Sequence, residues 1–158
     1  MEYTKEMFLQ QQTYATLFSV SNKLQVLGDK YLESLTSRQL MTMIAIAHLP
    51  KGEATLNAIS KKIGTTKQNV KQIVTALERK GYIVTRPSEK DKRACNIEIT
   101  EIGKEVFISC SMRGMDFFEL LFNKFTIEEM ESFWGYLKRL YSFDGEIQDG
   151  FEDIATLE

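Results

Sequence analysis

The sequence predicts a mainly α-helical protein that carries one small β-hairpin. Apolar residues recur at helical spacing over most of the chain, and strand-like alternation occurs only in residues 82–86 and 96–100. Only two prolines interrupt this pattern. The composition, 43% hydrophobic and 27% charged, is that of a globular protein and excludes a disordered chain. A length of 158 residues fits a single domain.

The first predicted element is a long helix over residues 5–33. It contains no proline, and its apolar side chains recur at helical spacing from Met7 to Tyr31. At about 1.5 Å per residue, about 27 residues of helix span about 40 Å. This length exceeds what the core of so small a chain requires, so we expect part of the helix to pack against a partner.

Two shorter helices follow, and a capping threonine introduces each of them. Thr36 with Gln39 fits a capping box at the start of the second helix, which ends near Pro50. The third helix starts near Thr55 and ends at Gly64, a residue type that favours the left-handed conformation just past a helix. Each helix has apolar residues at helical spacing, so we expect both to contribute to one core.

A fourth helix begins immediately after the third. Thr65 with Gln68 fits another capping box, and Gly81 ends the helix. Because only residues 64–66 separate the third and fourth helices, their spacing is that of a helix-turn-helix. The buried face of the fourth helix is expected to consist of Val70, Ile73, Val74 and Leu77.

A β-hairpin follows the helix-turn-helix. Residues 82–86 and 96–100 alternate as strands, and a charged, turn-rich loop at 88–93 joins them. A hairpin in this position would form the wing of a winged helix-turn-helix. We assign this lobe to residues 36–100.

Two further helices and an acidic tail complete the chain. Thr100 caps the fifth helix, and Thr126 with Glu129 fits a capping box at the start of the sixth, so both lie within residues 101–143. Residues 144–158 contain six acidic and no basic side chains. We expect this tail to fray, although three apolar residues could dock it: Phe151, Ile154 and Leu157.

Charge is distributed unevenly along the chain. Residues 51–93 hold 11 Lys or Arg and 4 Asp or Glu, a balance of +7, whereas the remainder holds 9 basic and 18 acidic residues, a balance of −9. The two balances sum to the net charge of −2. A basic module that coincides with a helix-turn-helix is the electrostatic footprint of nucleic-acid binding. The alternative is a solvated surface, which is the usual meaning of a charge run.

The face of the fourth helix opposite its apolar residues provides the candidate recognition residues. Gln and Asn can bridge N6 and N7 of adenine, while Lys can reach guanine or a phosphate. The helix is acidic only at Glu78, near its end. An ordinary exposed helix face is the alternative interpretation. The candidate DNA-binding residues are Thr66, Lys67, Gln68, Asn69, Lys71 and Gln72.

The hairpin adds a second basic cluster. Lys90, Lys92 and Arg93 lie at its tip, and Arg86 lies on the preceding strand. Such a tip can reach a minor groove or the flanking phosphates. Asp91 can accept hydrogen bonds from turn amides and orient the guanidinium of Arg93. A solvent-exposed turn is the alternative interpretation here.

These motifs resemble the MarR family of regulators. The runs 35–39 and 55–64 are similar to helix starts of that family, and the polar helix that follows leads into Gly81-Tyr82-Ile83. Asp91-Lys92-Arg93 followed by Ile97-Glu98-Ile99-Thr100 looks like the family's wing signature, D-x-R-x-x-x-L-x-L-T, with Ile in place of Leu. The resemblance covers about residues 5–143.

The resemblance implies a homodimeric winged helix-turn-helix repressor of the bacterial cytoplasm. The fourth helix would read the major groove, and Arg93, positioned by Asp91, would enter the minor groove. The fold class is then a single MarR-like domain over residues 1–158, with the winged helix-turn-helix flanked by N- and C-terminal dimerisation helices at 5–33 and 101–143. Family members often release DNA when a small aromatic or lipophilic effector binds.

Aromatic residues favour a dimer independently of the resemblance. Nine of the 17 aromatic side chains lie within residues 117–143. A small winged-helix lobe cannot cover so much apolar surface, so a partner subunit is expected to do so, with a private core as the alternative. Two-fold symmetry predicts a pseudo-palindromic operator in double-stranded DNA.

The remaining reactive residues predict no further site. Cys95 and Cys110 are too few for a disulfide framework and are interpreted as small apolar fillers, with oxidation of Cys95 beside the wing as the weaker hypothesis. His48, the only histidine, is expected to cap or pack. The sequence therefore predicts no metal site and no cofactor.

The sequence predicts no catalytic activity. It contains no GxSxG, P-loop, dinucleotide-binding glycine pattern or HExxH. It also contains neither a secretory signal pattern nor an apolar stretch of about 18 residues, so we expect a cytoplasmic protein with no membrane partner. The competing class is a protein-interaction module whose basic face binds an acidic protein partner.

Overall fold

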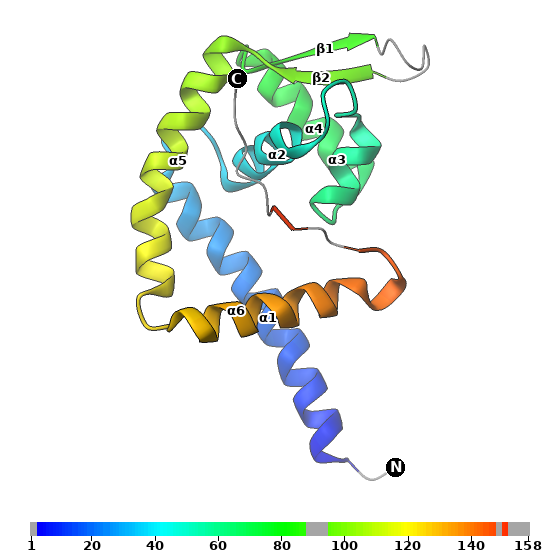
Figure 1. Ribbon diagram of the computed structural model, residues 1–158, viewed down its shortest axis with the longest axis vertical. Coiled ribbons are helices and arrows are strands. Elements are labelled where there is room, and N and C mark those ends of the chain that lie inside the picture. Colours follow the sequence, from blue (N-terminus) through cyan, green and yellow to red (C-terminus); the bar gives the residue numbers. More distant parts are fainter. Residues whose placement is uncertain (1–2, 88–94, 148–149, 152–158) are drawn as a thin grey trace.

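The computed structural model describes residues 3–87, 95–147 and 150–151. In chain order the elements are α1 (Lys5–Tyr31), α2 (Ser37–His48), α3 (Leu56–Lys62), α4 (Lys67–Arg79), β1 (Ile83–Pro87), β2 (Cys95–Ile99), α5 (Glu101–Phe122), α6 (Ile127–Tyr141) and a 3₁₀ turn at Ser142–Asp144. Figure 1 shows two parts: a lobe formed by α2, α3, α4 and the hairpin, and a frame in which α1 and α5 extend from the lobe and α6 crosses α1.

The winged-helix lobe, comprising α2, α3, α4 and the β1–β2 hairpin, contains most of the core of the chain, and Phe107 and Cys110 of α5 add to it. α4 packs against both α2 and α3, and the antiparallel hairpin pairs Ile83 with Ile99 and Thr85 with Ile97. The largest fully buried side chains all lie in this lobe: Thr42, Met43, Ile59, Val70, Leu77 and Ile97. Burying a large apolar side chain stabilises the fold by about 1.5–3 kcal/mol, so these residues hold the lobe together.

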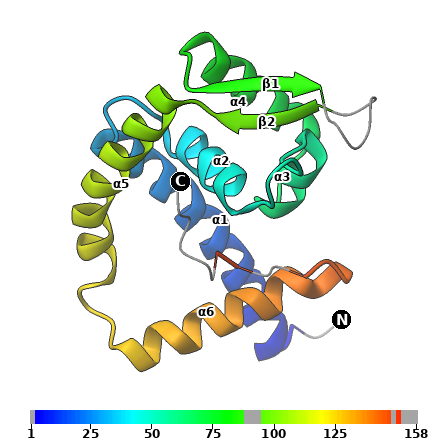
Figure 2. The same cartoon turned by 45° about the horizontal axis from the view of Figure 1, so that its top comes forward.

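The hairpin is attached to the segment that precedes α3. The amide of Ile97 donates to the carbonyl of Ala54 at 2.9 Å, and the amide of Ala54 donates to Oδ1 of Asn96 at 3.1 Å. At the other end of the hairpin, the amide of Thr100 donates to the carbonyl of Tyr82 at 3.0 Å. These bonds fix the hairpin to the helical core, and Figure 2 shows it lying across the helices of the lobe.

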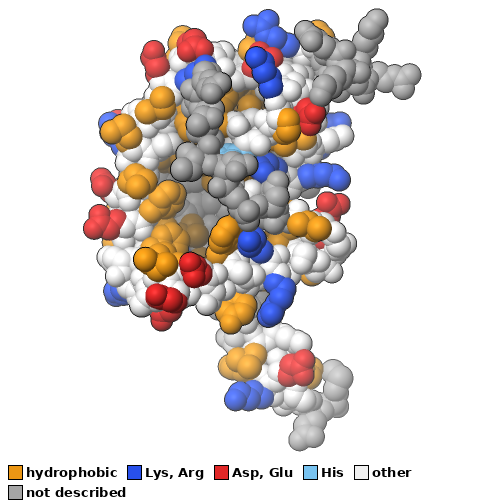
Figure 3. All heavy atoms as spheres, in the orientation of Figure 1, with side chains coloured by type: hydrophobic (Ala, Val, Ile, Leu, Met, Phe, Trp, Pro, Cys, Tyr) orange, Lys and Arg blue, Asp and Glu red, His pale blue; other side chains and the backbone are white. Residues whose placement is uncertain are grey.

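The helical frame, comprising α1, α5 and α6, packs much less completely. Gly28 is the only buried residue of α1, and α6 has no buried residue. Large apolar side chains of the frame remain exposed, and Figure 3 shows hydrophobic side chains gathered over α5 and α6. None of the helices in the described part of the chain is long and apolar enough to cross a membrane.

A close approach at Gly28 joins the frame to the lobe. A Cβ atom there would lie 2.5 Å from Oγ of Ser37, so a larger residue at position 28 would force the Ser37 hydroxyl to move. The amide of Ser37 donates to Oδ1 of Asp29 at 2.6 Å, and Nε of Arg38 donates to Oε1 of Gln25 at 2.6 Å. The last two turns of α1 are therefore fixed, whereas its N-terminal half extends beyond the lobe (Figure 1).

The predicted fold class is confirmed, and so are two of the capping boxes. Thr36 with Gln39 and Thr126 with Glu129 each form both reciprocal hydrogen bonds. Thr55 and Thr100 cap α3 and α5 as expected. The first helix ends at Tyr31, two residues before the predicted boundary.

The capping box predicted from Thr65 and Gln68 is wrong by one residue. The N-cap of α4 is Thr66, whose hydroxyl accepts from the amide of Asn69 at 3.2 Å. The reason lies in the end of α3, where the amide of Thr65 donates back to the carbonyl of Ser60 at 3.0 Å. This bond keeps Thr65 in the preceding turn, so Thr66 is the first residue able to cap α4.

Candidate nucleic-acid interface

The recognition face of α4 is held in a fixed direction by the opposite side of the helix. Val70 and Leu77 are fully buried and Val74 nearly so, while Ile73 is half-buried. Because these residues lie at helical spacing, the polar residues between them must face away from the core. The buried face expected from the sequence is therefore confirmed.

All the candidate residues on α4 and at its cap are exposed. The side chains of Lys67, Gln68, Lys71 and Gln72 form no hydrogen bond or ion pair within the described residues, so their donors and acceptors are available to a ligand. The first turn contains no acidic residue. The N-terminus of the helix dipole and two lysines therefore create a surface that attracts an anion such as a phosphate.

Two of the candidates have local structural roles. The hydroxyl of Thr66 caps α4, and the side-chain amide of Asn69 donates to Oγ1 of Thr65 at 3.2 Å. These bonds use one acceptor of Thr66 and one donor of Asn69. Both residues keep further hydrogen-bonding capacity. The hydroxyl of Thr66 has one donor and a second acceptor site, and the amide of Asn69 has a second donor and two acceptor sites.

Arg86 lies exposed on β1 and belongs to a network that the sequence did not reveal. Its Nε donates to Oε2 of Glu98 at 3.2 Å, and Oε1 of Glu98 accepts from Nδ2 of Asn96 at 3.0 Å. Asn96 is only 6% exposed and also accepts the amide of Ala54. Asn96 thus links the loop before α3, through Glu98, to the guanidinium of Arg86.

The predictions for the tip of the wing lie outside the described residues. They concern Lys90, Asp91, Lys92 and Arg93. The described part of the hairpin fixes the strands on both sides of the tip, with Pro87 opposite Cys95. These four residues therefore remain predictions from the sequence.

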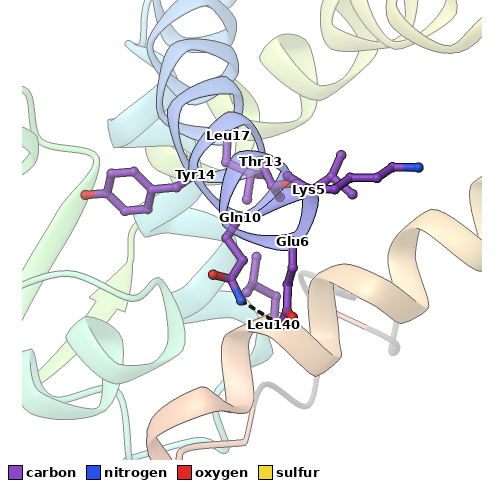
Figure 4. Close-up of a pocket in the computed structure, with 8 residues that line it drawn as sticks. Lys5, Glu6, Gln10, Thr13, Tyr14, Leu17 and Leu140 are labelled. Carbon is purple, nitrogen blue, oxygen red and sulfur yellow. Dashed lines mark hydrogen bonds between the residues drawn. The ribbon is translucent and has the colours of Figure 1, made fainter. Parts of the chain in front are cut away.

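The described residues reveal no metal cluster, but an apolar groove lies along α1. No group of three or more His, Cys, Asp and Glu residues in that part of the chain could hold a metal ion. The groove has a volume of about 670 Å³ and, among the described residues, is lined by side chains of α1 together with Leu140 of α6. Figure 4 shows it beside the first turns of α1, where Nε2 of Gln10 donates to Oε1 of Glu6 at 3.3 Å.

Cys95, Cys110 and His48 are placed as ordinary structural residues. Cys110 is buried in the core, while Cys95 is exposed on β2. Nδ1 of His48 lies 2.9 Å from the carbonyl of Ile44, and its ring packs edge-on against Phe151 at 5.3 Å. The packed histidine expected from the sequence is confirmed.

This architecture defines a winged helix-turn-helix protein. α2, α3 and α4 pack together, α4 turns its polar face outward, and the hairpin follows α4 as the wing. The family model MarR_2, described as MarR family, matches residues 33–94. Residues 33–94 are thus similar to the MarR family, and the match covers α2, α3, α4 and β1. No curated protein sequence matches the chain.

Solved structures share the fold over nearly the whole chain. A Staphylococcus aureus MepR–DNA complex is 22% identical, covers 89% of this chain and 98% of its own, and has a TM-score of 0.69. A MarR/EmrR family transcriptional regulator from Acinetobacter sp. ADP1 is 24% identical to this chain. The match covers 84% of this chain and 94% of the Acinetobacter chain, with a TM-score of 0.72. The PcaV transcriptional regulator of Streptomyces coelicolor, in complex with its natural ligand, is 15% identical to this chain. The match covers 91% of this chain and 99% of the PcaV chain, with a TM-score of 0.76.

Proposed function

We propose that the protein is a homodimeric, sequence-specific DNA-binding repressor that acts in the bacterial cytoplasm. The observation that supports the proposal is the exposed polar face of α4, whose Lys and Gln side chains form no hydrogen bond or ion pair with the described residues, while the opposite face is buried in the core. A helix fixed in this way presents base-reading groups at a defined angle. The MepR structure noted above is a complex with DNA, as is that of FabT from Streptococcus pneumoniae.

The proposal assigns different roles to the residues of the lobe. Gln68 and Gln72 would read base edges in the major groove, with Asn69 at the margin. Lys67, Lys71 and the helix N-terminus at Thr66 would contact phosphates and set the register. On the wing, Arg93 would enter the minor groove and Asp91 would orient it, while Arg86, Lys90 and Lys92 would contact flanking phosphates.

The helical frame supports the homodimer in this proposal. Trp134, Phe133 and Leu140 of α6 are each more than two-fifths exposed, although large apolar patches are unusual on monomers. A second copy covering these faces would place two copies of α4 about one helical turn of DNA apart. The operator should then be a pseudo-palindrome.

A small apolar effector is the proposed release signal. The groove between α1 and Leu140 has a volume of about 670 Å³, which lies within the range of about 300–1,000 Å³ typical of small-molecule sites. Two structures of similar fold contain a small molecule. PcaV is in complex with its natural ligand, and RdhR-CbdbA1625 is in its 2,4-dichlorophenol-bound form. A ligand that binds the DNA-free arrangement more tightly would release the operator.

A fluorescence-anisotropy titration tests the proposal. The probe is labelled DNA from upstream of the protein's own gene, and unlabelled random DNA competes at near-physiological salt. Specific binding should exceed nonspecific binding by about 10³-fold or more. Gln68→Ala should lower the discrimination between operator and mutated operator more than it lowers nonspecific affinity.

Arg79→Ala is the matched control because Arg79 is exposed in the last turn of α4, distant from the helix N-terminus. It should change the discrimination little. If random DNA abolishes all binding across a set of genomic fragments, the repressor proposal fails. The basic face would then belong to the competing class, a module that binds an acidic protein.

A further inference from the structure

The end of α6 lies against the turn of the helix-turn-helix. The hydroxyl of Tyr141, the last residue of α6, donates to the carbonyl of Lys61 in α3 at 2.8 Å, across 80 positions of the sequence. Figures 1 and 2 both show the C-terminal end of α6 on the side of the lobe occupied by α3. Partial burial, followed by the charges of Asp144 and Glu146, raises the pKa of Tyr141, which favours the protonated phenol that donates this hydrogen bond.

The contact completes the hydrogen bonding at the end of α3. That helix ends in a Schellman motif, in which the amide of Thr65 donates to the carbonyl of Ser60 at 3.0 Å and the amide of Gly64 donates to the carbonyl of Lys61 at 3.2 Å. The Lys61 carbonyl thus accepts from both Gly64 and Tyr141. A carbonyl oxygen has two lone pairs, and this arrangement uses both.

The Tyr141 ring also lies close to Gly64, where a side chain would crowd it. A Cβ atom on Gly64 would lie 3.2 Å from Cε2 and 3.4 Å from the hydroxyl oxygen of Tyr141. Gly81 ends α4 with the same type of motif, yet a Cβ atom there would meet nothing within 4 Å. Both glycines have positive φ, +65° and +74°, so the ring contact is what distinguishes Gly64.

The residues after α6 extend this contact across the lobe. Glu146 lies 3.7 Å from Nζ of Lys61, and Nζ of Lys62 donates to the carbonyl of Gly150 at 3.2 Å. The ring of Phe151 lies 5.1 Å from Nζ of Lys62 and packs edge-on against His48, the last residue of α2. We call Tyr141, Glu146, Gly150 and Phe151 the C-terminal clamp.

The clamp contacts the lobe away from its recognition face. Its partners are Lys61, Lys62, Gly64 and His48, at the ends of α2 and α3, whereas the polar side chains of α4 stay exposed. A segment that blocked DNA would be expected to cover those side chains. The geometry therefore favours a clamp that positions the lobe over one that masks it.

We propose that the C-terminal clamp fixes the orientation of the helix-turn-helix relative to α6, so that Tyr141 and Phe151 are positioning residues for specific DNA binding. α6 has no buried residue of its own, so its terminal contacts carry much of its hold on the lobe. The proposal deepens the proposed function and depends on it for the DNA readout. It names no contact between the clamp and DNA.

The test compares Tyr141→Phe and the double variant Tyr141→Phe/Phe151→Ala with the unmodified protein. Tyr136→Phe is the matched control, because Tyr136 lies on the same helix and is 61% exposed. Amide hydrogen exchange without DNA reports on the clamp, and operator titration reports on binding. The double variant should exchange faster at residues 61–65 and bind the operator about fivefold to tenfold more weakly, as expected for about 1–1.4 kcal/mol of lost positioning.

Nonspecific affinity should change less than twofold, because a positioning role affects the fit to the operator and leaves the basic face intact. Tighter operator binding by the double variant would overturn the proposal and indicate a blocking tail. Unchanged exchange at residues 61–65 would also overturn it. If the unmodified protein binds no specific DNA, the proposed function fails, while the exchange comparison still decides whether the clamp holds the turn.

Discussion

The winged-helix lobe and the helical frame differ in how much of their apolar surface is buried. In the lobe, Met43, Ile59 and Leu77 are all fully buried within one chain. In the frame, Met112 is 70% exposed and α6 buries nothing. The core is thus centred on the lobe, with Phe107 and Cys110 of α5 packed into it, while the rest of the frame has apolar faces that the single chain leaves uncovered. The contrast fits the proposed homodimer, in which a second copy would cover the apolar faces of the frame.

The largest expected effect comes from breaking the core of the lobe. Met43→Ala should lower the free energy of unfolding by about 2–5 kcal/mol, because it leaves a cavity in a fully packed site. Thermal unfolding followed by circular dichroism measures the loss. Met112→Ala, at an exposed frame position, should leave the unfolding of the lobe within about 0.5 kcal/mol. Equal losses from both variants would contradict the distinction between lobe and frame.

A charge placed on the frame should separate subunits without unfolding the lobe. Trp134→Glu puts a carboxylate on the exposed apolar face of α6, so we expect a monomer in light scattering. Loss of the second half-site should weaken operator binding by on the order of 100-fold. Glu131→Gln, on the same helix, should keep the dimer. A dimeric Trp134→Glu variant would place the interface elsewhere.

The two glycines that end α3 and α4 sharpen the comparison within the lobe. Ala at either position must adopt a positive φ, which costs about 1–2 kcal/mol. Gly64→Ala should cost more than Gly81→Ala, because only Gly64 lies against Tyr141. Chemical denaturation measures both. In a Tyr141→Ala background the difference should disappear, and its persistence would show that the ring contact is not its cause.

The smallest expected effect concerns the network at the base of the wing. Glu98→Gln removes an exposed ion pair with Arg86, so the free energy of unfolding should change by less than about 1 kcal/mol. Because Arg86 loses its counter-charge, DNA binding should strengthen slightly and depend more steeply on salt. Anisotropy titrations over a salt series test this. A weaker affinity at every salt would indicate that Glu98 holds Arg86 in its productive orientation.

Local sequence signals predicted most of the fold. Helical periodicity, capping threonines and the glycines after α3 and α4 depend on residues within about one helical turn, so the sequence reveals them directly. The exposed face of α4 followed from the same periodicity. The cap of α4 was missed by one residue because the choice between Thr65 and Thr66 depends on how α3 ends.

Contacts between distant segments could not be predicted in this way. From the alternating pattern of its strand, Asn96 is expected to be an ordinary exposed polar residue. In the structure it is buried, because it contacts Ala54 in the loop before α3. The tail after α6 was expected to fray unless an apolar residue docked it, and Phe151 does dock, against His48. Neither Tyr141 nor Gly64 carries a sequence signal for their contact, since the two residues meet only after α6 has folded back across the molecule.

Because α6 has no buried residues, it can tilt as a rigid rod about one of its ends. A helix of 15 residues is about 22 Å long, so a tilt of about 5° about one end displaces the other end by about 2 Å. A packed helix would resist such a tilt through its neighbours along its whole length. With its main hold on the lobe at one tip, α6 could convert a small rearrangement between the subunits of the proposed homodimer into a larger shift of the turn that precedes α4.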